Sequence, residues 1–67
     1  MIILVNGESR EVAPPITLAQ FMDGLAMRSF DGVAAALNDC VVPRSAWGGR
    51  PLADGDRLLL IQAAQGG

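Results

Sequence analysis

The first part of the chain alternates apolar runs with turn residues. Residues 2–5 are an unbroken run of aliphatic side chains, and the pair Asn6-Gly7 follows directly. Residues 9–13 resume with an alternating pattern, and prolines at 14 and 15 end it because proline cannot donate a hydrogen bond to a strand ladder. An Asn-Gly pair between two such segments is typical of a tight hairpin turn. The pattern therefore predicts a β-hairpin formed by residues 2–5 and 9–13.

The next segment has the start signal and the periodicity of a helix. Thr17 and Gln20 have the spacing of a capping box, in which each side chain accepts a hydrogen bond from the other residue's backbone N–H. Apolar side chains then recur at i, i+3, i+4 and i+7, which places them on one helical face: Leu18, Phe21, Met22 and Leu25. We therefore expect a helix that begins at Leu18, is slightly weakened by Gly24, and covers one face of a sheet.

Two shorter apolar segments follow the helix. Residues 33–37 predict a buried strand, although their three alanines would also suit a helix. Asn38-Asp39 predicts a turn, and residues 40–42 predict a short strand. Pro43 ends that strand, which is typical of an edge strand or a strand end. Glycines at 48 and 49 and a proline at 51 then predict an irregular connection.

The last apolar run follows the turn sequence Asp54-Gly55-Asp56. Residues 57–61 contain four consecutive aliphatic side chains, a pattern typical of a central strand covered on both faces. Strand side chains alternate between faces, however, and one helix covers only one face of so small a sheet. We therefore also expect some apolar surface to remain exposed near the end of this strand.

Composition narrows the classes of function. The chain has 67 residues, enough for one domain, with no His and a single Cys, which excludes a disulfide framework and a thiolate-bound iron-sulfur or zinc site. A formal charge of -2 and scattered arginines argue against nucleic acid and favour a basic protein partner. The apolar run at the start has no positive flank and is far too short to span a bilayer, so we expect no membrane association and a cytoplasmic location.

Several short motifs, spread along the whole chain, accompany this predicted order of strands and helix. They are the first strand ending at Asn6, Thr17-Leu18 at the helix start, residues 36–38, Val42-Pro43-Arg44 with Trp47, Asp54-Gly55-Asp56 before residues 58–60, and Gly66-Gly67 at the end. The combination resembles the ThiS family, sulfur carrier proteins of thiamine biosynthesis. The resemblance implies an α+β fold of the β-grasp (ubiquitin-like) type, with a small mixed sheet packed on one main helix. It also implies a single domain over residues 1–67, in which residues 62–67 form a flexible, extended diglycine tail.

The tail carries the chemistry that the resemblance implies. As in that family, an adenylating enzyme would join the Gly67 carboxylate to AMP, sulfur from a persulfide would displace the AMP, and the resulting thiocarboxylate would deliver sulfur for thiazole formation. Gly66, Gln65 and Ala64 would enter the partner's active site, where glycine fits a channel too narrow for a side chain. From Gln62 the tail reaches roughly 20 Å when extended.

The resemblance implies that the chain is a protein cosubstrate and not an enzyme. The implied partners are a ThiF-like adenylyltransferase that uses ATP, a ThiG-like thiazole synthase and a sulfur donor supplied by a cysteine desulfurase, and the chain itself holds no cofactor or metal. The candidate partner interface consists of Leu58, Leu60 and Arg44. The sequence does not show whether Leu58 and Leu60 or Leu59 and Ile61 face outward. Three alternatives remain: a small-subunit-type carrier of molybdopterin synthase, whose tail usually has prolines before the diglycine, a ubiquitin-like protein modifier, and a plain binding module.

Other residues that could carry chemistry have simpler interpretations. We expect Cys40 to be a buried packing residue and not an acceptor of persulfide sulfur, because free cysteine is among the most buried residue types. Trp47 could anchor a partner, but packing in the small core is favoured. Arg44 could stack on Trp47 if the residues between them form a helical turn. Asp54 and Asp56 are interpreted as turn residues and not as metal ligands.

Overall fold

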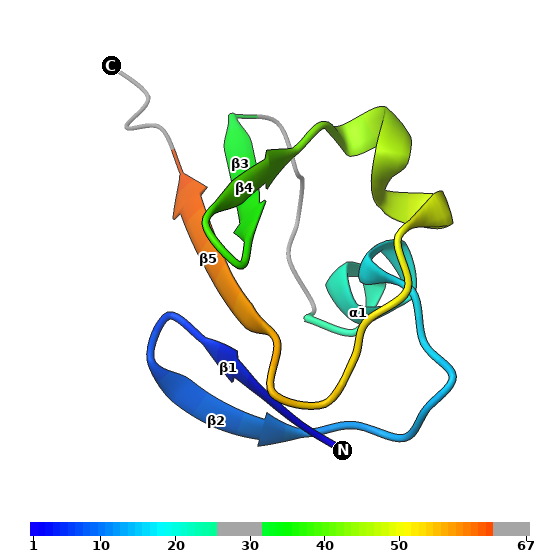
Figure 1. Cartoon of the computed structure of the whole chain (residues 1–67). Coiled ribbons are helices and arrows are strands. Elements are labelled where there is room, and N and C mark those ends of the chain that lie inside the picture. Colours follow the sequence, from blue (N-terminus) through cyan, green and yellow to red (C-terminus); the bar gives the residue numbers. More distant parts are fainter. Residues whose placement is uncertain (26–31, 63–67) are drawn as a thin grey trace.

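The chain folds as a five-stranded sheet with an α-helix and a short 3-10 helix on one side (Figure 1). The computed structural model describes residues 1–25 and 32–62. Its elements are β1 (Ile2–Val5), β2 (Glu8–Glu11), α1 (Leu18–Asp23), β3 (Val33–Leu37), β4 (Cys40–Val42), the 3-10 helix η1 (Arg44–Gly49) and β5 (Arg57–Gln62). This is the order that the sequence predicts, with η1 in place of part of the irregular connection.

The β1–β2 hairpin is confirmed. The strands pair antiparallel, from Ile2 opposite Glu11 to Val5 opposite Glu8. Asn6 and Gly7 have φ angles of 51° and 84°, left-handed values that a type I′ turn requires and that Asn and Gly adopt easily. The second strand ends at Glu11, earlier than predicted, and all its side chains are exposed. Its alternating sequence therefore does not mark a buried face.

The helix begins where the sequence predicts. The Thr17 hydroxyl accepts a hydrogen bond from the Gln20 N–H at 3.2 Å, and the Gln20 side-chain oxygen accepts one from the Thr17 N–H at 2.9 Å. These two bonds complete the capping box. The helix is only six residues long, and Gly24 is its C-cap instead of an interior residue. The predicted apolar face is confirmed: Leu18, Phe21 and Met22 are buried, and Leu25 packs against the core just beyond the helix.

The helical alternative for residues 33–37 is wrong, because these residues form β3 between two strands. Its neighbours are β4 and β5, both antiparallel to it. Burial of Ala35 and Leu37 in the core outweighs the intrinsic helix preference of alanine. Asn38 and Asp39, with φ angles of 52° and 70°, form the predicted turn into β4.

The sheet is mixed, with the strand order β2-β1-β5-β3-β4. β5 lies in the centre, parallel to β1 and antiparallel to β3, so the prediction of a central last strand is confirmed. The expectation that both faces of β5 are covered is wrong. Leu59 and Ile61 are 50% and 53% exposed. The two helices, α1 and η1, lie together on the other side of the sheet and leave this face uncovered (Figure 1). A mixed sheet that packs on one helix confirms the predicted β-grasp arrangement.

The core lies between the sheet and the two helices. Its buried side chains come from β1, α1, β3, η1, β5 and the segment before β5: Ile3, Val5, Leu18, Phe21, Met22, Ala35, Leu37, Trp47, Leu52 and Leu58. Trp47 is only 3% exposed, and its indole N–H donates to the Val42 carbonyl oxygen at 2.8 Å. The core-packing interpretation of Trp47 is therefore confirmed.

The expected burial of Cys40 is wrong, since its thiol is exposed. Cys40 is the first residue of the three-residue edge strand β4, opposite Leu37. An edge strand has a neighbour on one side only. Burial statistics for cysteine do not capture this position at the periphery of a small sheet.

Candidate functional site

The four tail residues predicted to act in a partner's active site, Ala64, Gln65, Gly66 and Gly67, lie outside the described residues. The structure does place the point from which the tail begins. Gln62, which we predicted to open the tail, is the last residue of β5 and pairs with Val33 of β3. The origin of residues 63–67 is therefore held by the central strand of the sheet.

The turn that precedes β5 fixes the start of this strand. The Asp54 carboxylate accepts a hydrogen bond from the Ile2 N–H at 2.7 Å. The Asp56 carboxylate accepts one from the Asn38 side-chain amide at 2.9 Å and one from the Ala53 N–H at 2.7 Å. Gly55 lies between them with a φ of 86°. The turn interpretation of these aspartates is confirmed, and no group of three possible metal ligands occurs within residues 1–25 and 32–62.

The apolar side chains of β5 divide between two faces. Leu58 is 2% exposed and belongs to the core, and Leu60 packs partly buried against it. Leu59 and Ile61 point to the opposite, helix-free face. Leu58 is therefore too buried to form the exposed partner interface that we predicted, and the interface role of the partly buried Leu60 stays a prediction. The expected exposed apolar surface exists, but the other pair provides it.

The helix-free face of the sheet carries several exposed apolar side chains. Its large exposed side chains are Ile2 and Leu4 from β1, Val41 from β4, and Leu59 and Ile61 from β5, and each is between 37% and 73% exposed. Ala34 and Ala36 of β3 lie opposite Ile61 and Leu59. Their short side chains leave room beside the two larger ones. We call this set of seven residues the outer face.

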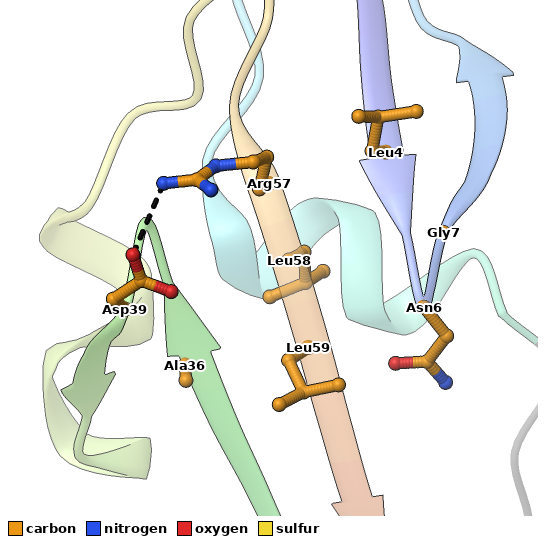
Figure 2. Close-up of a pocket in the computed structure, with 8 residues that line it drawn as sticks. All are labelled: Leu4, Asn6, Gly7, Ala36, Asp39, Arg57, Leu58 and Leu59. Atoms are coloured by element: carbon orange, nitrogen blue, oxygen red, sulfur yellow. Dashed lines mark hydrogen bonds and ion pairs between the residues drawn. The ribbon is translucent and has the colours of Figure 1, made fainter.

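A hollow opens at the end of the outer face nearest the hairpin turns (Figure 2). It has a volume of ≈ 550 Å³ and is lined by Leu4, Asn6, Gly7, Ala36, Asp39, Arg57, Leu58 and Leu59. The Arg57 guanidinium contacts the Asp39 carboxylate at 3.1 Å on its rim, with side chains 60% and 84% exposed. An ion pair so exposed contributes little to stability, so both charges remain accessible to a partner.

Arg44, the third predicted interface residue, is exposed but lies away from the outer face. It is the first residue of η1, which packs against α1 on the covered side of the sheet (Figure 1). The helical turn required for stacking of Arg44 on Trp47 is present, and the stacking itself stays a prediction. The structure thus does not bring Arg44 together with Leu59 and Ile61.

Two asparagine side chains that the sequence marks only as turn residues also act on β5. Asn6 accepts a hydrogen bond from the Leu60 N–H at 2.8 Å, and Asn38 accepts one from the Arg57 N–H at 2.9 Å. At both positions the sequence indicated only a turn, because Asn tolerates left-handed backbone angles. It gave no indication of the hydrogen bonds to β5. Within the described part of the chain, no helix is long and apolar enough to cross a membrane.

Comparison with known proteins identifies the family. The ThiS family model matches residues 3–67. The sulfur carrier protein ThiS of Escherichia coli (strain K12) is 36% identical over 67 residues, which cover all of both chains.

Two solved structures of a ThiS thiamine biosynthesis protein from Geobacter metallireducens are also similar, each with 26% identity. The crystal structure has a TM-score of 0.86 with full coverage of both chains. The solution structure has a TM-score of 0.80 and is matched over 88% of its length by the whole of this chain. The order of elements, the β-grasp sheet and these matches agree, and the chain therefore belongs to the ThiS family.

Proposed function

We propose that the chain is a sulfur carrier of thiamine biosynthesis that bears its sulfur as a thiocarboxylate on Gly67. The observation that carries this proposal is the family match, which extends through Gly67 and over the full length of the Escherichia coli relative. The chain would act as a protein cosubstrate for enzymes and not as an enzyme. Because activation consumes ATP, we place this cycle in the cytoplasm.

The chemistry follows from the properties of a terminal carboxylate. With an ordinary pKa of about 3.5 it is ionised at neutral pH and resists nucleophiles. Attack of its oxygen on the α-phosphate of ATP releases pyrophosphate and gives an acyl-adenylate with AMP as a good leaving group. The terminal sulfur of a cysteine-derived persulfide then displaces AMP, and a thiol reduces the remaining S–S bond to free the thiocarboxylate. A ThiF-like adenylyltransferase, a cysteine desulfurase and a ThiG-like thiazole synthase would catalyse activation, sulfur supply and sulfur use.

The outer face is the surface on which we propose that the adenylating enzyme docks. It is apolar, and it includes Leu59 and Ile61 of the strand from which the tail begins. A tail that bound alone would lose much conformational entropy for few contacts. A preformed apolar surface beside its origin supplies binding energy and directs the carboxylate towards the active site.

Transfer of AMP to the chain tests the proposal. The ThiF-like enzyme of the same organism is incubated with labelled ATP and either the wild-type chain or a variant lacking Gly67. Label should appear on the wild type only, while far-ultraviolet circular dichroism shows that both fold alike. Equal labelling of the two chains, or no labelling of either, would contradict the assignment of Gly67.

A further inference from the structure

β5 extends beyond the end of its neighbour β1. With β3 it pairs over its length, from Leu58 opposite Leu37 to Gln62 opposite Val33. With β1 it pairs only at Arg57 and Leu58, because β1 ends at Val5 and the chain turns away into the hairpin. The part of β5 closest to the tail therefore has strand support from β3 alone.

Asn6 supplies the support that β1 lacks. Its backbone N–H donates to the Leu58 carbonyl oxygen at 2.9 Å, and its side-chain oxygen accepts from the Leu60 N–H at 2.8 Å. Figure 2 shows the Asn6 side chain turned towards β5 from the tip of the hairpin. The left-handed backbone of Asn6, with φ of 51°, starts the turn while its side chain extends the β1–β5 ladder.

We propose that Asn6 is a positioning residue for the tail. By holding Leu60, it keeps the last residues of β5 in the sheet, and it thereby fixes the point from which the tail starts relative to the outer face. This proposal rests on the proposed function and adds to it a residue with a defined role. Without the hydrogen bond from the Leu60 N–H to Asn6, the end of β5 must be ordered when the adenylating enzyme binds. The affinity of the chain for the enzyme therefore falls, while the chemistry of the bound carboxylate is unchanged.

The chain contains a matched control in Asn38. This residue also has a left-handed backbone, with φ of 52°, and its side-chain oxygen also accepts from a β5 N–H, that of Arg57 at 2.9 Å. It acts at the start of β5, far from the tail. Its side chain also donates to Asp56, so Asn38→Gly removes more hydrogen bonding than Asn6→Gly. A purely structural effect should therefore be at least as large for Asn38→Gly.

The experiment compares Asn6→Gly, Asn6→Asp and Asn38→Gly with the wild type. Glycine keeps the left-handed turn and removes the acceptor, whereas aspartate keeps an acceptor oxygen but has no amide donor. Loss of one hydrogen bond corresponds to a factor of about five. We expect Asn6→Gly to raise the KM for adenylation by about that factor at unchanged kcat, and Asn6→Asp to restore it within about twofold. Asn38→Gly should leave KM within about twofold of the wild type.

Amide hydrogen exchange of the free chain gives a second readout that needs no enzyme. At Leu60, Asn6→Gly should exchange at least about five times faster than the wild type, and Asn38→Gly should not. Equal KM for Asn6→Gly and the wild type, an equal rise for Asn38→Gly, or unchanged exchange at Leu60 would overturn the proposal. Failure of Asn6→Asp to restore KM would assign the effect to direct contact of the Asn6 amide with the enzyme. If the wild type is not adenylated at all, the proposed function fails, and exchange at Leu60 still decides whether Asn6 holds β5.

Discussion

Two adjacent leucines of β5 should respond in opposite ways to the same substitution. Leu58 is 2% exposed and lies in the core, while Leu59 is 50% exposed on the outer face. Truncation of a buried leucine to alanine costs about 3 kcal/mol or more, because a cavity adds to the lost transfer free energy. Leu59→Ala removes three carbon groups, each worth about 0.8 kcal/mol when fully buried. Because Leu59 is only half buried, we expect its truncation to lower the free energy of unfolding by about 1 kcal/mol.

The difference is large relative to the stability of so small a domain. At about 0.05–0.15 kcal/mol per residue, a chain of this length has a free energy of unfolding of about 3–10 kcal/mol. Leu58→Ala should therefore remove a third or more of the total and Leu59→Ala much less. Urea unfolding followed by the fluorescence of Trp47, the single tryptophan, measures both losses.

Binding should show the reverse order. Docking of the adenylating enzyme on the outer face buries the exposed half of Leu59, which is worth about 1 kcal/mol, so Leu59→Ala should weaken binding by about fivefold. Leu58→Ala should leave affinity within about twofold under conditions where it is folded, since Leu58 has almost no surface to offer. Isothermal titration calorimetry against the enzyme measures both. If Leu59→Ala bound normally, or if Leu58→Ala were the weaker binder while still folded, the docking surface would lie elsewhere.

Other substitutions separate the tail from the folded domain. Gly66→Phe should abolish AMP transfer at unchanged unfolding free energy, and normal transfer would show that the partner's channel accepts side chains. Cys40→Ser should leave thiocarboxylate formation and stability nearly unchanged because the thiol is exposed, whereas a selective loss of sulfur loading in a mass spectrum would give Cys40 a role in transfer. Thr17→Ala removes one acceptor of the capping box and should lower the free energy of unfolding in urea by about 1 kcal/mol, with AMP transfer unchanged. A decrease below about 0.3 kcal/mol would mean that the cap does not stabilise the domain.

Local chemistry made much of the fold predictable from the sequence. The capping box set the start of α1, and the Asn6-Gly7 pair set the first hairpin, because each depends on residues close together in the chain. The run of aliphatic residues in β5 predicted a central strand. It did not reveal which residues face outwards, because both faces of that run are apolar and the choice depends on pairing with distant strands.

Long-range contacts account for what the sequence analysis missed. Asn6 and Leu60 are 54 positions apart, so no local pattern indicated their hydrogen bond. The exposure of Cys40 depends on the place of β4 at the sheet edge, which is set by pairing with β3. Membership of the chain in the ThiS family, in contrast, was recognisable from motifs spread along the whole sequence.

The most direct test of the central claim is the intact mass of the chain isolated from its own cells under sulfur-replete conditions, with fragmentation to locate any change. We predict a population whose mass differs by the replacement of one oxygen with sulfur, and fragments that place the sulfur on Gly67. A chain that carries no sulfur under these conditions, or one recovered as a covalent adduct with the lysine of another protein, would contradict the account.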